Sequence, residues 1–187
     1  MSYQQERRTR NFSTDSIEPQ SHTPLLQRLD SLTSVDVDTY TSLLKVCGSC
    51  LRDCRKLHDH IIKHGYRSNR FLGFLILEMY GKCGLLRNAR DLFDQLHVRN
   101  VVTWTTLIGG HVECGYGNEA LNVFEEMKVE RVFPNAMTYV YVLKACGIVG
   151  ALKKGCELHS EIANQRLLKA NLFIRSSLLD MYVKCGC

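Results

Sequence analysis

The residues best suited to chemistry in this sequence are cysteines and histidines, and the densest group has the ligand types and short spacing of a zinc site: Cys47-x2-Cys50-x3-Cys54-x3-His58. Cys47 recurs as Cys146, however, in a stretch where the counterparts of Cys50 and Cys54 are not cysteine. We therefore predict that the chain has no metal site. Four recurring cysteines are interpreted as small buried hydrophobic residues: Cys47, Cys83, Cys146 and Cys185.

Two His-x-Glu pairs match one half of a zinc deaminase motif: His111-Val112-Glu113 and His159-Ser160-Glu161. Neither pair is followed by the Pro-Cys-x-x-Cys sequence that would complete the metal site. A glycine-rich string is similar to a dinucleotide-binding loop, but no strand precedes it and we interpret it as a turn: Gly115-x-Gly117-x-x-Ala120. We predict that the chain has no catalytic residues, binds no cofactor and is not an enzyme.

The composition is that of a folded protein, with 45% hydrophobic and 23% charged residues among 187. The longest apolar stretch, residues 71–77, is less than half of the roughly 18 residues that a membrane-spanning helix needs. The N-terminus lacks the apolar core of a secretory signal, so we expect the nine cysteines to be reduced thiols in an intracellular compartment. The formal net charge of +5 is compatible with a polyanionic partner.

An internal repeat organises most of the chain. Residues 77–84 are echoed by residues 179–186, and residues 44–48 are echoed by residues 143–147. Within this long unit asparagine returns at a finer spacing, and each one ends a segment: Asn69, Asn100, Asn135 and Asn171. The repeat therefore divides the chain into segments 37–69, 70–100, 101–135 and 136–171, and 172–187 opens a fifth.

Each segment has the pattern of two amphipathic helices joined by a small-residue turn. In 70–100, apolar residues recur at helical spacing on both sides of Gly84. Residues 138–143 favour a strand in isolation, because they are rich in Thr, Tyr and Val, but the repeat register predicts a helix there. Such a unit buries its apolar face only by stacking on copies of itself. We therefore predict an all-α solenoid whose concave surface is lined by the first helix of each unit.

Two repeat families fit these units. One segment carries features of a tetratricopeptide repeat, which would make the chain a protein-interaction scaffold: Trp104, Leu107, Ala120, Phe124 and Pro134. The uniform period of about 34 residues in that family is absent here. The unequal segment lengths, the Met-Tyr-x-Lys-Cys-Gly ending and the Leu-Lys-x-Cys-Gly ending closely resemble the pentatricopeptide repeat proteins of plants, in the subclass with alternating P, L and S motifs.

By this resemblance, 37–69 and 136–171 are L-like, 70–100 and the partial 172–187 are S-like, and 101–135 is P-like. The resemblance implies a right-handed superhelical solenoid that binds single-stranded RNA sequence-selectively in a mitochondrion or chloroplast. It implies a role in RNA editing, processing or stability, with a separate editing or processing enzyme as a further partner. Because both His-x-Glu pairs lack the rest of the zinc motif, we predict no deaminase domain at the C-terminus of this chain. No membrane and no small-molecule substrate are implied.

In that family the fifth and last residues of a motif read the edge of a base, and the second residues of neighbouring motifs hold its ring. The resemblance assigns base reading to seven residues: Thr105, Asn135, Thr41, Asn69, Asn100, Asn171 and Ser176. It assigns the base sandwich to four: Val102, Met137, Phe71 and Phe173. By the family's code Thr105 with Asn135 favours adenine, whereas Phe74 and Val140 occupy fifth positions without edge-reading atoms.

A purely structural interpretation of the same residues stays open. Each of the four asparagines precedes a predicted helix, where asparagine is a preferred N-cap. Thr41 and Thr105 lie in the first helical turn, where a hydroxyl also caps.

The two ends of the chain lie outside complete repeats. Residues 1–36 are polar, and we expect them to be disordered, with a weak likeness to an organellar transit peptide. A short amphipathic cap is predicted there at Leu25, Leu26 and Leu29. At the other end the fifth segment lacks a second helix, so we expect the chain to be incomplete or to associate with a partner.

Overall fold

The computed structural model describes residues 35–187, apart from 48–50, 97, 166 and 168–170. Almost all of the predicted disordered segment 1–36, including the predicted cap at Leu25, Leu26 and Leu29, lies outside these residues. The described part of the chain is helical and contains no strand, which confirms the predicted fold class. None of its helices is long and apolar enough to cross a membrane.

Each of the first four repeats consists of a first and a second helix, and a further first helix follows them. The first helices are α2 (Val37–Val46), α4 (Arg70–Lys82), α6 (Val101–Glu113), α8 (Ala136–Val149) and α11 (Leu172–Lys184). The second helices are α3 (Leu51–Lys63), α5 (Leu86–Gln95), α7 (Gly117–Val129) and α9 (Leu152–Asn164), and a short 3₁₀ helix, η2 (Tyr66–Ser68), follows α3. Residues 138–143 lie inside α8, so the packing of the repeat prevails over the local strand preference.

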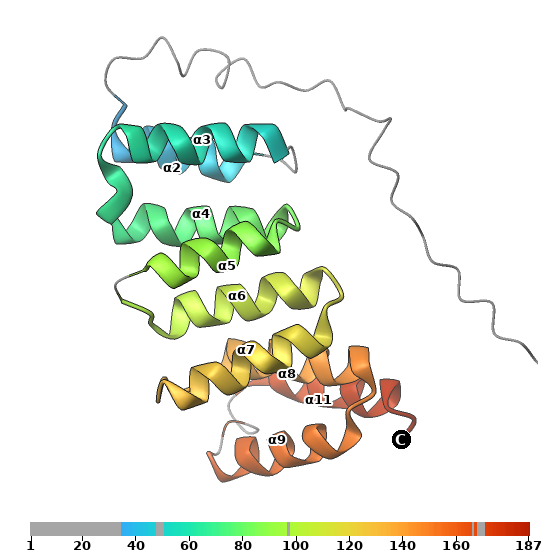
Figure 1. The fold of residues 1–187 in the computed structure, drawn as a ribbon. Helices are drawn as coiled ribbons and strands as arrows, with labels where there is room; N and C mark the ends of the chain where they lie inside the picture. Colours follow the sequence, from blue (N-terminus) through green and yellow to red (C-terminus); the bar gives the residue numbers. More distant parts are fainter. Residues whose placement is uncertain (1–34, 48–50, 97, 166, 168–170) are drawn as a thin grey trace, which may run out of the picture.

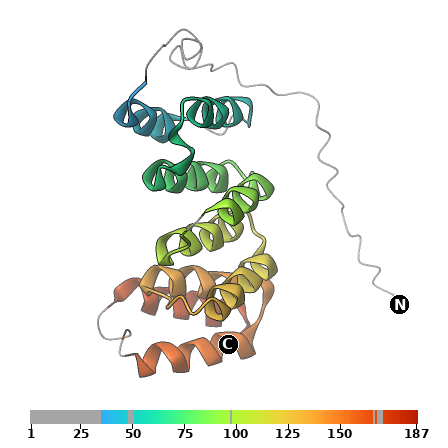
Figure 2. The same ribbon diagram turned by 60° about the vertical axis from the view of Figure 1, so that its left-hand side comes forward.

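The helices form two layers that progress together along the solenoid (Figure 1). First helices of successive repeats pack directly on one another, in the order α2, α4, α6, α8 and α11. Each second helix packs on the first helix of its own repeat and on that of the next. The turned view shows the same stacking of helices from α2 to α11 (Figure 2). Every first helix therefore presents equivalent residues along one side of the stack.

The interior between the layers is filled by large aromatic side chains that are less than 2% exposed: Tyr40, Phe93, Trp104, Phe124 and Tyr139. Small residues stand where first helices cross. A Cβ atom on Gly110 of α6 would lie 3.0 Å from the Cα of Gly81 in α4, so a larger residue there would force the two backbones apart. Burial of these aromatic rings stabilises the fold, because each removes a large apolar area from water.

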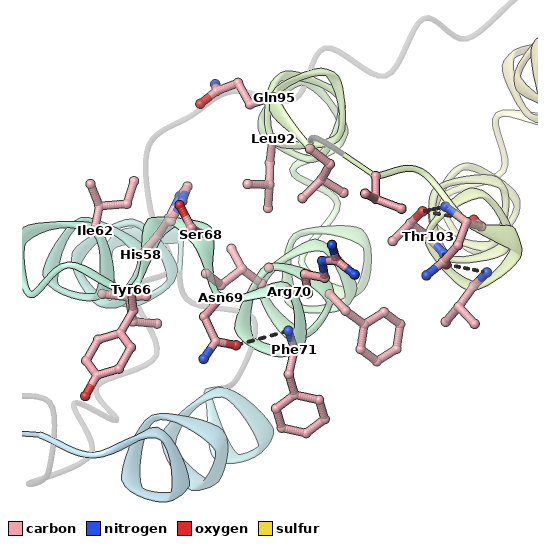
Figure 3. Close-up of a pocket in the computed structure, with 18 residues that line it drawn as sticks. His58, Ile62, Tyr66, Ser68, Asn69, Arg70, Phe71, Leu92, Gln95 and Thr103 are labelled. Carbon is pink, nitrogen blue, oxygen red and sulfur yellow. Dashed lines mark hydrogen bonds between the residues drawn. The ribbon is translucent and has the colours of Figure 1, made fainter.

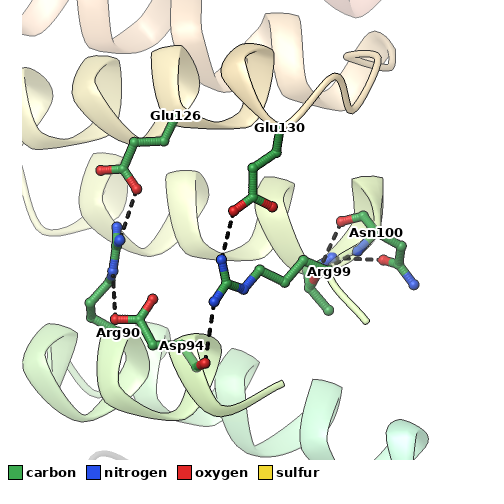
Figure 4. A network of polar contacts seen from close by, with 7 residues as sticks. Arg90, Asp94, Arg99, Asn100, Glu126 and Glu130 are labelled. Carbon is green, nitrogen blue, oxygen red and sulfur yellow. Dashed lines mark hydrogen bonds and ion pairs between the residues drawn. The ribbon is translucent and has the colours of Figure 1, made fainter. Parts of the chain in front are cut away.

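Ion pairs link successive second helices on the outside of the solenoid (Figure 4). Arg90 of α5 pairs with Glu126 of α7 at 2.8 Å, and Arg99, which follows α5, pairs with Glu130 at 2.6 Å. Exposed ion pairs of this kind contribute about 0–1 kcal/mol each. They therefore add little to the total free energy of unfolding.

Candidate nucleic-acid interface

Four large apolar side chains are exposed at the same position of four first helices. Each is the second residue of its helix and is between 47% and 72% exposed: Phe71, Val102, Met137 and Phe173. The next residue of each helix turns inward and is buried: Leu72, Thr103, Thr138 and Ile174. Exposed apolar groups that recur in one register mark a surface built for contact, because exposing them to water is unfavourable.

The residue before each of these helices is an asparagine that caps it. The side-chain oxygen of Asn69 accepts hydrogen bonds from the backbone amides of Phe71 and Leu72, at 3.1 Å each. Asn100 and Asn171 cap α6 and α11 in the same way, and Asn135 caps α8 by accepting from the backbone amide of Thr138. The capping interpretation of the asparagines is therefore confirmed. Capping uses only Oδ1, and no hydrogen bond within the described residues engages the four side-chain nitrogens, so each asparagine keeps a donor for a further contact.

Thr105 and Asn135 are joined by hydrogen bonds through Thr138, the third residue of α8. The Thr138 hydroxyl donates to Oδ1 of Asn135 at 3.0 Å, and the hydroxyl oxygens of Thr105 and Thr138 are 2.7 Å apart. Thr138 has one hydroxyl proton and gives it to Asn135, so Thr105 donates in the bond to Thr138. The Thr105 oxygen then keeps its acceptor capacity, and the side-chain nitrogen of Asn135 remains a donor. Thr105 does not cap α6, where the capping box is made by Asn100 and Thr103.

A groove of about 700 Å³ brings the predicted residues of this repeat together. Val102 from α6 and Met137 from α8 line it, and so do Thr105 and Asn135. Two apolar side chains and one acceptor–donor pair therefore face the same space, although they come from two different repeats.

Tyr141 also lines this groove, and the sequence analysis missed it. Its ring packs over Gly109 of α6, where a Cβ atom would come within 3.0 Å of the ring. Burial, with the nearby carboxylates of Glu113 and Glu78, raises the pKa of the Tyr141 hydroxyl, which therefore stays a hydrogen-bond donor at neutral pH. Its position four residues after Met137 was the available signal, since that spacing puts both side chains on one helix face.

A second pocket, of about 840 Å³, lies beside the first turns of α4 and α6 (Figure 3). Phe71, Phe74 and Val102 line it, together with the capping residues Asn69 and Asn100. Between α3 and α5 its lining is mainly apolar: Ile61, Ile62, Leu92 and Leu96. This pocket offers aromatic and aliphatic contacts, and the Asn100 amide is the predicted base-reading group of its repeat.

The remaining base-reading candidates line neither of these pockets. The Thr41 hydroxyl donates to the carbonyl oxygen of Val37 within α2, at 2.8 Å. Ser176 is exposed on α11, and Asn171 caps the same helix. Val140, at a fifth position, is only 7% exposed and points into the interior.

The charges that border the groove are paired with one another. Lys82 and Glu78 of α4 are 2.7 Å apart, and Lys144 of α8 is 3.9 Å from Glu113 of α6. These are exposed pairs worth about 0–1 kcal/mol each, so an incoming anion can compete with the carboxylates for either lysine. The Lys144 ammonium also lies 5.8 Å from the centre of the Tyr141 ring.

The histidines of the apparent metal motifs have structural partners. His58 Nδ1 lies 2.6 Å from the Tyr80 hydroxyl, His159 Nδ1 lies 2.9 Å from the Tyr182 hydroxyl, and His111 Nδ1 lies 2.9 Å from the backbone oxygen of Leu107. Among the described residues, no three histidine, cysteine or acidic side chains are arranged to hold a metal ion. Cys50 lies outside them.

Comparisons with known proteins agree with this architecture. The PPR repeat family model matches residues 99–147, and the PPR repeat model matches residues 75–101. A chloroplastic pentatricopeptide repeat-containing protein of Arabidopsis thaliana is 40% identical over 150 residues, which are 79% of this chain and 24% of that protein. A mitochondrial one from the same plant is 38% identical over 149 residues, with the same shares covered.

Among solved structures, the pentatricopeptide repeat protein PPR10 in complex with an 18-nucleotide psaJ RNA element superimposes with a TM-score of 0.73 at 17% identity. The match covers 86% of this chain and 24% of that one, and it shows a shared fold. Stacked helical hairpins with capped first helices thus define the chain as a helical-repeat solenoid.

The matched repeats and relatives define the family as well. The chain belongs to the PPR repeat family. It spans about a quarter of the length of the curated relatives that it matches.

Proposed function

We propose that the chain binds single-stranded RNA along the side of the solenoid formed by its first helices, and that it supplies no chemistry of its own. The observation that carries this proposal is the register of exposed apolar side chains two residues after each capping asparagine: Phe71, Val102, Met137 and Phe173. Unstacked bases suit such a row of apolar side chains, because each base has an apolar face that can pack on them and a polar edge that can form hydrogen bonds. The RNA-bound neighbour PPR10 supports the same choice of ligand.

The groove between α6 and α8 suggests how one base is recognised. Val102 and Met137 hold the ring, while Thr105 presents an acceptor and Asn135 a donor. An exocyclic amino group beside an unprotonated ring nitrogen complements that pair, which is the pattern on the Watson–Crick edge of adenine. Cytosine carries the same pattern on a smaller ring, and the family code favours adenine at such a site.

The neighbouring pocket has a different character and gives weaker discrimination. Phe71, Phe74 and Val102 supply stacking, and Asn100 supplies an edge contact without a polar partner at the fifth position. We expect this site to contribute affinity and little selectivity. We therefore expect the chain to bind few bases and to show only a modest preference for one sequence over its scrambled version.

The biological setting is part of the proposal. Relatives whose names mark them as chloroplastic or mitochondrial favour an organellar RNA as the target. We propose that the repeats alternate in the P, L and S manner and that the bound RNA is edited, processed or stabilised, with any chemistry supplied by a separate enzyme.

The test is a binding titration of the whole chain with end-labelled homopolymeric RNAs, measured by fluorescence anisotropy at several salt concentrations. Oligo(A) should bind best, and affinity should fall as salt rises because phosphate contacts release counterions. Replacing Val102 and Met137 together by Ser removes one stacked base and should weaken oligo(A) binding about 5- to 150-fold. Val129→Ser is the matched control, since Val129 is 82% exposed but lies at the end of a second helix.

Equal loss in the control, or unchanged binding in the double variant, would contradict the proposed interface. A further variant addresses base choice. Thr105→Asn should shift preference from oligo(A) toward pyrimidines, as the family code implies, without a loss of helix content.

A further inference from the structure

Among the described residues, three cysteine thiols meet where the first two repeats join. Cys47 is the C-cap of α2, Cys54 is a buried residue of α3, and Cys83 is the C-cap of α4. The Cys54 sulfur lies 3.1 Å from that of Cys83 and 3.8 Å from that of Cys47. All three are thiols, and the shorter contact joins side chains from two repeats that are otherwise held together by packing.

We propose that Cys54 and Cys83 form a peroxide-reactive dithiol site that closes to a disulfide between the first and second repeats. The two sulfur atoms are about 1 Å farther apart than in a disulfide, where the bond is roughly 2.05 Å, so a small shift of one side chain brings them to bonding distance. This inference does not depend on the proposed RNA binding.

The two thiols are placed for different roles. Cys83 is half-buried, so a small oxidant can reach it, whereas Cys54 is fully buried beneath it. The hydrogen bond from Cys54 lowers the pKa of the Cys83 thiol, and the nearby Lys82 ammonium lowers it further. A lowered thiol pKa raises the thiolate fraction, and the thiolate is the nucleophile. Cys83 is therefore the attacking residue and Cys54 the resolving one.

The chemistry balances with hydrogen peroxide as the oxidant. The Cys83 thiolate attacks one peroxide oxygen, the O–O bond breaks, and hydroxide leaves and is protonated to water, which gives a sulfenic acid on Cys83. The Cys54 sulfur then attacks the Cys83 sulfur, the S–O bond breaks, and a second water leaves with the Cys54 proton. Two thiols and one peroxide become one disulfide and two waters, and the two sulfurs lose two electrons.

The chain contains its own control for this site. In α9 the position of Cys54 is taken by Gly155, and the sulfur of Met181 occupies the space that a Cβ atom on residue 155 would need. The counterparts of Cys47 and Cys83 are Cys146 and Cys185, and the Cys185 thiol donates to the backbone oxygen of Cys146 at 3.8 Å. Burial raises the pKa of the Cys146 thiol to about 11. We expect no disulfide in this second copy.

The experiment treats the reduced whole chain with a small excess of hydrogen peroxide, blocks remaining thiols with an alkylating reagent and maps tryptic peptides without reduction. Trypsin places Cys54 in residues 53–55, Cys83 in 83–87, and Cys47 with Cys50 in 46–52. The expected product is 53–55 linked to 83–87, two hydrogens lighter than the sum. The midpoint of thermal unfolding should rise on oxidation and return when a reductant is added.

Two variants make the result specific. Cys54→Ser should abolish the linked peptide and leave Cys83 as a sulfenic acid that dimedone traps, whereas Cys156→Ser, which removes an exposed cysteine of α9, should leave the linkage intact. If Cys54→Ser does not fold, Cys83→Ser replaces it, with loss of the linkage again expected. A link from 53–55 to 46–52, equal oxidation of Cys185, or alkylation of both Cys54 and Cys83 after peroxide treatment would overturn the proposal.

Discussion

Two junctions of the solenoid are copies of each other, and their differences show which contacts the repeat requires. The N-terminal junction is formed by α2, α3 and α4, and the C-terminal junction by α8, α9 and α11. In both, a histidine of the second helix meets a tyrosine of the following first helix, edge to face: His58 with Tyr80 and His159 with Tyr182. The capping asparagine is shared as well, at Asn69 and Asn171.

The interior of the two junctions is built differently. In the N-terminal junction the thiol of Cys54 occupies the interior. In the C-terminal junction the equivalent residue is Gly155, which leaves room for the side chain of Met181. The buried Tyr40 hydroxyl meets His60 Nδ1 at 2.8 Å, and the corresponding Tyr139 hydroxyl donates to the Glu161 carboxylate at 2.7 Å. The repeat therefore tolerates different interior side chains as long as volume and hydrogen bonding are satisfied within each junction.

The largest difference between the junctions should appear when both receive the same side chain. Gly155→Val places a branched residue against Met181, and we expect it to lower the free energy of unfolding by about 1–3 kcal/mol through overpacking. Cys54→Val nearly conserves volume and should cost less than about 1.5 kcal/mol. Urea unfolding followed by circular dichroism measures both. Equal costs would mean that the C-terminal junction relaxes around the new side chain.

A smaller contrast is expected at the buried tyrosines. Tyr139→Phe leaves the carboxylate of Glu161 and the amide of Gln165 without their shared hydroxyl, and we expect a loss of about 1.5 kcal/mol, since the bond involves a charged group. Tyr40→Phe removes one hydrogen bond to His60, whose ring remains stacked on His64, and should cost about 1 kcal/mol. The same unfolding titration compares the two. A costlier Tyr40→Phe would reverse the assigned order.

The smallest expected effect is a dependence of stability on pH that His58 contributes. Burial lowers the pKa of His58 below its ordinary value of 6.5, and Asp59 opposes part of this shift. Below pH 6.5 the unfolded chain therefore takes up the proton more readily than the folded one, and stability falls as pH falls through that range. His58→Gln should flatten this part of the profile of unfolding free energy against pH. His159→Gln, which removes the equivalent hydrogen bond, is the matched control, and an unchanged profile in His58→Gln would contradict the assignment.

Much of the fold could be predicted from the sequence because one helical hairpin recurs along the chain at a nearly regular spacing. The recurrence of asparagine at segment ends and the helical spacing around Gly84 predict the helical hairpins, and the first helices begin directly after those asparagines. The family resemblance singled out Val102 and Met137, and the structure exposes both at one register of the repeat. Every copy of the repeat predicts the same two helices. The strand preference of residues 138–143 is therefore outweighed by the helical pattern of the neighbouring copies.

The sequence by itself determined the helices, their caps and the exposed apolar residue at the start of each of four first helices. These features depend on residues within a few positions along the chain. Only the tertiary structure decided which side chains from different repeats meet. The hydrogen-bonded link from Thr105 to Asn135 through Thr138, the ring of Tyr141 on Gly109, and the contact of Cys54 with Cys83 each join separate helices. Such contacts depend on the distance and angle between helices, which the packing of the buried interior sets and no local pattern encodes.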